Sequence, residues 1–277
     1  MYPVLFHIGD IPIDSYATMM TLGFVAALAT IFYVTPKGGD APNTGGLDRP
    51  QVWDLFIVMV VSSIIGSKFG HVLFEAPGHK TETGETINSL WELLKDDPIH
   101  WARLGEAGYV WYGGMIGALL VAVYYFRKRP HLKAWLYADA FAPAIMLGAC
   151  VGRLGCFLAG CCYGQPTDGP LGVQFPRLPG PVIPTQLFDA GIALVLGLGL
   201  LWRFGRRRFD GENIALLLIT YPVLRATTEI FRGDADRGVY GAISTSQLLS
   251  IPLLAIGLWL YFHLKGRPDS RLAEQTS

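Results

Sequence analysis

The sequence predicts an all-α integral membrane protein with about seven transmembrane helices and a small periplasmic head. Hydrophobic residues make up 51% of the 277 residues and charged residues 16%, whereas about 25% of a typical soluble domain is charged. Apolar runs long enough to cross about 30 Å of hydrocarbon recur along the chain. The formal net charge is zero, so no overall basic field favours nucleic acid as a partner.

Seven apolar runs are the candidate transmembrane helices. The first follows a stretch without Lys or Arg, Met1–Ser15, and continues as an integral helix, so we do not expect a cleaved signal peptide. The second and third are bordered by the polar segment predicted to form the head. The fourth run ends in glycine-rich sequence, and the sixth ends in charged residues. The fifth run begins at Pro184, a residue that suits the first turn of a helix. The runs are Tyr16–Val34, Trp53–Phe74, Gly108–Phe126, Ala138–Leu158, Pro184–Trp202, Ile214–Phe231 and Ile243–Leu264.

Basic residues indicate the orientation of these helices. They concentrate in the loops after the odd-numbered runs, as at Arg127–Arg129 and Arg206–Arg208, and basic loops stay in the cytoplasm. The N-terminus is therefore predicted outside and the tail, residues 265–277, in the cytoplasm. The polar segment 76–107 then forms the periplasmic head. No internal repeat divides the chain, so we expect one membrane-embedded domain over residues 1–277.

Arg153 is the first candidate site residue. It lies at the end of the fourth run, within the glycine-rich stretch Val151–Gly164. An arginine at membrane depth is costly and normally faces a polar cavity and a partner. Glycines such as Gly155 let the backbone approach a ligand or a neighbouring helix closely. The stretch therefore predicts a pocket for an anionic head group.

A second cationic group lies on the sixth run. Arg225, Glu229 and Arg232 are spaced four and three residues apart, which places them on one helical face. Glu229 neutralises one arginine and leaves the other available, so that two arginines at one depth could grip a phosphodiester. The alternative for Arg232 is that its side chain only extends to the membrane interface.

Three further groups are candidates with structural alternatives. Tyr112, Gly113 and Gly114 form a compact motif, for which plain helix packing is the alternative. Tyr16 and Tyr112 could instead be interfacial belt residues. Gln186 follows the helix start at Pro184 and could face the same pocket.

All four cysteines, Cys150, Cys156, Cys161 and Cys162, lie in one short window. They are too clustered for a disulfide framework and lack a CxxC zinc spacing, so we expect no metal site. Cysteines there could pack as small hydrophobes, form a stabilising disulfide, or serve a membrane thiol oxidoreductase. Nothing in the sequence requires a cofactor.

These motifs, in this order, resemble the bacterial prolipoprotein diacylglyceryl transferase family. The Gly-Arg-x-Gly core is the most specific of them. The motifs are Ser15-Tyr16, Gly66–Phe74, Tyr112–Gly117, Gly152–Gly155, Pro184–Leu187, Arg225-x3-Glu229-x2-Arg232 and Ser246–Ser250.

The resemblance implies an enzyme that moves the diacylglyceryl group of phosphatidylglycerol onto the lipobox cysteine of a prolipoprotein, releasing glycerol phosphate. It implies a multi-pass, monomeric protein of the bacterial plasma (inner) membrane that binds no nucleic acid. Arg153 and Arg232 match motif arginines that would hold the leaving phosphate, and Tyr16 matches a tyrosine that would orient the head group. The expected lipid contacts are Arg153, Gly155, Cys156, Gly113, Gly114, Gln186 and Glu229.

Two residues depart from the family pattern. Tyr112 stands where the family usually has His, a natural general base, and Cys156 stands where it usually has Asn. These departures keep two other functions open. One is a thiol oxidoreductase that uses Cys156, Cys161 and Cys162, and the other is a lipid-binding membrane protein without catalysis.

Overall fold

The computed structural model describes residues 3–9, 11–35, 46–74, 110–176, 178–233, 239–240 and 243–266. The predicted head at 76–107 and the tail after Gly266 lie outside the described residues. Within the described residues the chain is mostly helical, as expected, with three two-stranded antiparallel hairpins. The hairpin strands are β1 (Val4–Ile8), β2 (Ile11–Asp14), β3 (Val173–Gln174), β4 (Pro181–Val182), β5 (Val239–Tyr240) and β6 (Ile243–Ser244).

Each predicted apolar run overlaps one helix of the described chain. Five of these helices are long and apolar enough to cross a membrane: α1, α2, α5, α6 and α8. The other two helices, α4 and α7, are less apolar because they carry charged side chains. α4 ends on Arg127 and Lys128, and α7 contains three charged residues. The helices are α1 (Ser15–Val34), α2 (Arg49–Phe74), α4 (Trp111–Lys128), α5 (Ala134–Ala159), α6 (Thr185–Phe204), α7 (Glu212–Glu229) and α8 (Thr245–Lys265).

Large apolar side chains remain exposed along the long helices. Val195 is 72% exposed and Phe262 67% exposed. A soluble monomer rarely exposes such extensive apolar surface, whereas a membrane helix presents it to lipid. The exposed faces therefore agree with a multi-pass membrane protein.

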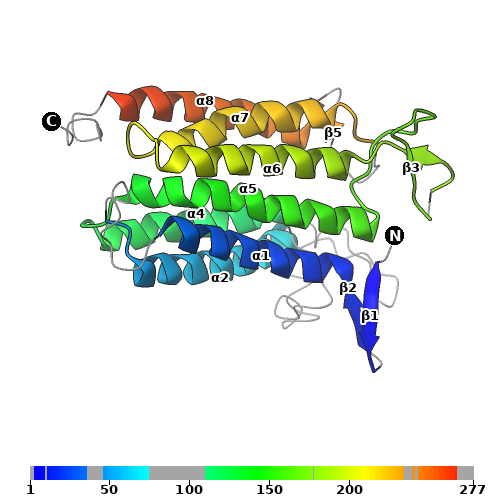
Figure 1. The fold of residues 1–277 in the computed structure, drawn as a ribbon, viewed down its shortest axis with the longest axis horizontal. Coiled ribbons are helices and arrows are strands. Elements are labelled where there is room, and N and C mark those ends of the chain that lie inside the picture. The colour runs from blue at the N-terminus through cyan, green and yellow to red at the C-terminus, as the bar shows by residue number, and fades with distance from the viewer. Residues whose placement is uncertain are drawn as a thin grey trace. The chain divides into compact units, whose positions relative to one another are not determined.

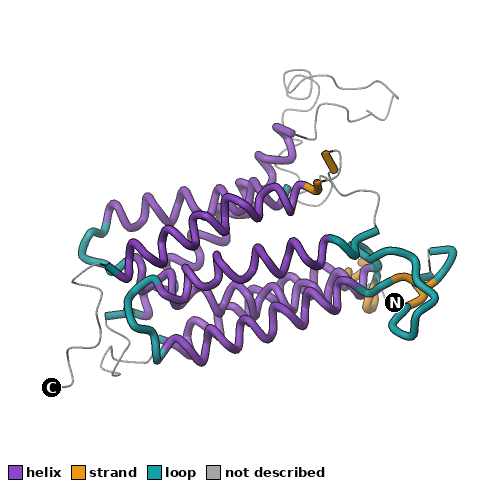
Figure 2. Tube along the Cα trace, turned by 90° about the horizontal axis from the view of Figure 1, so that it is seen from above, coloured by secondary structure: helices purple, strands orange, loops and turns teal. Residues whose placement is uncertain are grey.

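The chain packs as two compact units, Met1–Leu47 with Ala134–Ser277, and Asp48–Lys133. In the first unit α5 packs against α1, α6 and α7, and α8 packs against α7 (Figure 1). Its core includes Ala142 and Met146 of α5, which contact Leu200 of α6 and Leu217 of α7. The short strands of this unit lie toward one end, where α1 and α6 begin and α5 and α7 end (Figures 1 and 2).

Glycines set how closely the helices approach in each unit. In the first unit, a Cβ atom placed on Gly23 of α1 would lie 2.8 Å from the carbonyl oxygen of Gly148 in α5. In the second unit, a Cβ atom on Gly66 of α2 would lie 2.4 Å from the carbonyl oxygen of Gly113 in α4. Real Cβ atoms do not approach so closely, so both helix pairs depend on backbone-to-backbone contact.

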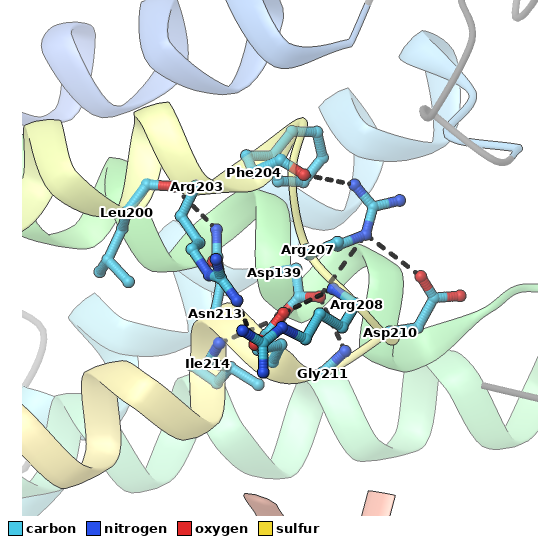
Figure 3. A network of polar contacts seen from close by, with 11 residues as sticks. Asp139, Leu200, Arg203, Phe204, Arg207, Arg208, Asp210, Gly211, Asn213 and Ile214 are labelled. Atoms are coloured by element: carbon cyan, nitrogen blue, oxygen red, sulfur yellow. Dashed lines mark hydrogen bonds and ion pairs between the residues drawn. The ribbon is translucent and has the colours of Figure 1, made fainter. Parts of the chain in front are cut away.

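A buried polar network holds the turn between α6 and α7 (Figure 3). Asp139 of α5 is fully buried, and its carboxylate accepts hydrogen bonds from the backbone N–H of Gly211 at 2.7 Å and of Ile214 at 3.0 Å. Arg207, also buried, lies 3.8 Å from Asp139 and 3.2 Å from Asp210. Asp139 thus satisfies N–H groups that the start of α7 leaves without helical partners. This network was not predicted from the sequence.

Candidate active site

Arg153 lies near the end of α5 and pairs with Asp189 of α6. Its Nη1 is 3.4 Å from Oδ2 of Asp189, and the two side chains are 23% and 9% exposed. The pair gives a poorly solvated arginine the opposite charge it needs. Asp189 was not among the sequence candidates, although a carboxylate within an apolar run is a signal that could have found it.

Arg232 follows α7 and is held by backbone pairing with the segment after α5. Arg232 forms an isolated antiparallel bridge with Gly164, and the N–H of Gln165 donates to the carbonyl oxygen of Phe231 at 2.9 Å. Its Nη1 is 3.9 Å from Oε2 of Glu229. The bridge therefore brings Arg232 to the same loop that continues from the helix of Arg153.

Glu229 contacts both Arg225 and Arg232, as the spacing of the three residues suggested. Its Oε2 is 2.5 Å from Nη2 of Arg225, much closer than the contact with Arg232. Glu229 also accepts hydrogen bonds from Ser246 and Ser244 at the start of α8. Of the two arginines that Glu229 contacts, Arg225 is therefore the closer partner.

The thiol of Cys162 lies in the electrostatic field of both arginines. It interacts electrostatically with both Arg232 and Arg153, and the hydroxyl of Tyr16 interacts with Arg153 and with Cys162. Hydrogen bonds from neighbouring cysteines, together with the two positive charges, lower the pKa of Cys162 despite its burial. The two arginines that the sequence placed on different helices therefore both act electrostatically on the loop after α5.

Gln186 and Gly155 lie at the same end of the first unit. Gln186 is fully buried, and its Nε2 donates to the carbonyl oxygen of Cys161 at 2.7 Å, which ties the start of α6 to the loop after α5. A Cβ atom on Gly155 would lie 2.8 Å from Cβ of Met19 in α1. Gly155 therefore lets α1, with Tyr16 at its first turn, approach the helix of Arg153 closely.

The first unit thus brings together Tyr16, Arg153, Gly155, Cys156, Gln186, Glu229 and Arg232. Tyr112, Gly113 and Gly114 belong to the second unit, where half-buried Tyr112 lies in the first turn of α4. A Cβ atom on Gly113 would lie 2.2 Å from the carbonyl oxygen of Gly66, and one on Gly114 would lie 2.9 Å from Oγ of Ser63. Both glycines therefore pack against α2, the structural role that the sequence left open for them.

Two surface pockets occur away from these residues. One, of about 390 Å³, is lined by Tyr33, Trp202 and Arg206 near the opposite end of the first unit. The other, of about 350 Å³, lies between α2 and α4 of the second unit and is lined by residues including Asp54 and Tyr125. Neither pocket contains a predicted site residue.

Comparison with known proteins identifies the family. The family model described as prolipoprotein diacylglyceryl transferase matches residues 3–263, nearly the whole chain. The chain belongs to the prolipoprotein diacylglyceryl transferase family. This confirms the resemblance drawn from the motifs.

Individual members of the prolipoprotein diacylglyceryl transferase family agree over their full length. A phosphatidylglycerol–prolipoprotein diacylglyceryl transferase of Clostridium tetani is 32% identical and covers 94% of this chain and 97% of its own. A second such transferase of Clostridium perfringens is 32% identical, with coverage of 96% and 98%. One of Bordetella bronchiseptica is 31% identical, with coverage of 97% for both chains. The similarity therefore includes the helices that carry the candidate site.

Proposed function

We propose that this membrane protein transfers the diacylglyceryl group of phosphatidylglycerol to the lipobox cysteine of prolipoproteins and releases glycerol phosphate. Family membership over residues 3–263 carries this proposal. Relatives that match over nearly their whole length are named for this transfer. The electrostatic interaction of both Arg153 and Arg232 with Cys162 supports the proposal that these arginines bind the phosphate that leaves.

The reaction needs a sulfur nucleophile and a stabilised leaving group. The thiolate of the lipobox cysteine attacks the glycerol carbon that carries the phosphate, because the thiol form is a poor nucleophile. The new carbon–sulfur bond forms as the carbon–oxygen bond to phosphate breaks, and the departing oxygen keeps the electron pair. Arg153 and Arg232 hold the phosphate where negative charge grows, which favours the transition state over the bound lipid.

The other site residues take supporting roles in this proposal. Tyr16 orients the head group, and Gly155, Cys156 and Gln186 border the lipid. A role for Tyr112 as base or hydrogen-bond donor toward the thiol, and lipid contact by Gly113 and Gly114, stay predictions from the family motif. Asp189 holds the Arg153 guanidinium in position, and Glu229 restrains Arg225 and orients Arg232.

The membrane arrangement is part of the same proposal. We expect seven transmembrane helices in a bacterial inner membrane, with the N-terminus outside and the C-terminal tail 265–277 in the cytoplasm. The five long apolar helices and the cytoplasmic side predicted for Arg206–Arg208 support this arrangement. One membrane-embedded domain, a periplasmic head at 76–107 and a monomeric state stay predictions.

The direct test uses the purified full chain in detergent with phosphatidylglycerol and a lipobox peptide. Wild-type protein releases glycerol phosphate, and the peptide gains the mass of a diacylglyceryl group. Arg153→Ala lowers the rate by at least about 10²-fold, the usual loss when one group that stabilises the transition-state charge is removed. Arg208→Ala is the matched control, because this exposed arginine lies at the α6–α7 turn, and its backbone N–H contact with Glu212 survives the substitution. Absence of release from folded wild-type protein would refute the proposal.

One observation favours a second candidate, a thiol oxidoreductase. The sulfur atoms of Cys156, Cys161 and Cys162 all lie within 4.8 Å of one another. The double variant Cys161→Ser with Cys162→Ser separates the two functions. If the protein is a transferase, the double variant keeps substantial glycerol phosphate release. If it is an oxidoreductase, the double variant loses the ability to oxidise or reduce thiols. Lipid binding by wild type without any release would favour the non-catalytic alternative.

A further inference from the structure

Three cysteines converge at the end of α5, outside the groups that the transfer reaction uses as cations. The sulfur atoms of Cys156, Cys161 and Cys162 lie within 4.8 Å of one another. Cys156 is buried, Cys162 is half-buried and Cys161 is exposed, so the group is reachable from outside. Cys150, the fourth cysteine, lies earlier in α5 and is not part of this group.

The turn after α5 creates the convergence. The N–H groups of Gly160 and Cys161 both donate to the carbonyl oxygen of Cys156, at 3.0 and 3.2 Å, and Gly160 has φ of +78°. Cys162 also has a positive φ, +61°, a conformation that few residues other than glycine adopt. This backbone reverses at once and directs the thiols of Cys161 and Cys162 back toward the thiol of Cys156.

Buried side chains of α6 hold the turn in place. Nε2 of Gln186 donates to the carbonyl oxygen of Cys161 at 2.7 Å, and Oγ1 of Thr185 donates to that of Cys162 at 2.8 Å. Both donors are at most 1% exposed. These hydrogen bonds fix the backbone of Cys161 and Cys162 and so limit the directions in which the two thiols can point.

The distances fit a thiophilic metal ion. Zinc bound tetrahedrally by thiolates at about 2.3 Å separates neighbouring sulfur atoms by about 3.8 Å, which is within the 4.8 Å limit of this group. Soft thiolates favour zinc over hard cations such as magnesium or calcium. Three thiolates and Zn²⁺ leave one net negative charge, and Arg153 and Arg232, which both interact with Cys162, compensate it.

We infer that Cys156, Cys161 and Cys162 form a three-thiolate site for Zn²⁺ at the end of α5, in place of the absence of a metal site expected from their spacing in the sequence. The fourth coordination position is left to water or to an external thiol. Two of the three roles that the sequence left open use the group less completely, because a disulfide pairs only two of the three sulfur atoms and packing needs no convergence of thiols. The metal site rests on the cysteine geometry and does not depend on the transfer reaction.

Zinc binding by the purified, tag-free full chain in detergent tests the inference. Reduced, metal-free protein is equilibrated with Zn²⁺ and desalted, and its zinc content is measured by elemental analysis. Affinity is measured by competition with a chromophoric chelator. We expect one Zn²⁺ per wild-type chain and a rise in the thermal unfolding midpoint with zinc. Co²⁺ in place of zinc should give thiolate-to-metal charge-transfer bands.

Variants assign the ligands. Cys161→Ala with Cys162→Ala should abolish stoichiometric binding, and Cys156→Ala should weaken affinity by at least tenfold. Cys150→Ala is the matched control and should bind zinc as wild type does. Equal zinc content in wild type and the double variant would overturn the inference, and so would loss of zinc binding in Cys150→Ala. A disulfide among these cysteines in protein isolated without an added oxidant would also overturn it. Glycerol phosphate release from the same double variant reports separately on the proposed function.

Discussion

Gly113 offers a sharp test of how α2 and α4 pack. A Cβ atom placed on Gly113 would lie 2.2 Å from the carbonyl oxygen of Gly66 and 3.1 Å from Cα of Gly70. Both neighbours are backbone atoms, which cannot rotate away as the end of a side chain can. The substitution Gly113→Ala therefore requires the two helices to separate.

The structure sets the size of the effect. The helices must part by about 0.8 Å to move the 2.2 Å contact to 3.0 Å, below which real Cβ atoms are essentially never found. Overpacking of this kind costs about 1 to 3 kcal/mol, and the rigidity of backbone contacts favours the upper end. Alanine returns about 1 kcal/mol through its better helix propensity. The net expectation is a loss of about 2 kcal/mol, or a midpoint lower by several degrees.

Thermal unfolding in one detergent provides the measurement. Gly199→Ala is the matched control, because Gly199 lies within α6 and a Cβ atom there would meet nothing within 4 Å. The same chemical change should leave the midpoint unchanged or raise it at this position. A Gly113→Ala midpoint equal to wild type would refute the packing argument. Full stability with lost transfer would instead assign Gly113 to lipid contact.

Three further substitutions test the partner of Arg153, the network at the α6–α7 turn and the cap of α8. Asp189→Asn removes the charged partner that lies 3.4 Å from Arg153. Misplacement of the guanidinium should lower kcat by up to about 10²-fold. An unchanged steady-state rate would contradict a positioning role for Asp189. Asp139→Ala removes the acceptor of two backbone N–H groups at the start of α7 and one of the two carboxylates near buried Arg207. We expect a loss of about 2 to 5 kcal/mol, seen as a lower unfolding midpoint. Ser244→Ala removes the capping box of α8 and should cost about 1 kcal/mol of helix stability. The loss should appear as faster hydrogen exchange at the backbone amide of Gln247. Unaltered exchange there would count against the cap.

The helices and the charged face of α7 could be predicted from the sequence. The run Ile214–Phe231 corresponds to α7, Glu212–Glu229, because a long apolar segment can satisfy its backbone in lipid only as a helix. Arg225 and Glu229 pair as their four-residue spacing predicted, since that spacing is decided within one helix. The family motifs were also visible as local strings of residues.

Only the tertiary structure decided which helix faces meet. Asp189 pairs with Arg153 across two helices, and Gln186 reaches the carbonyl oxygen of Cys161 rather than solvent. Cys156 meets Cys161 and Cys162 because a turn with two positive φ angles reverses the chain. An apolar run carries little information on its rotation about its own axis, because most of its positions are equally apolar. The sequence alone thus determined that this chain forms membrane helices with arginines in or next to them, and packing decided which partners those arginines and the thiols meet.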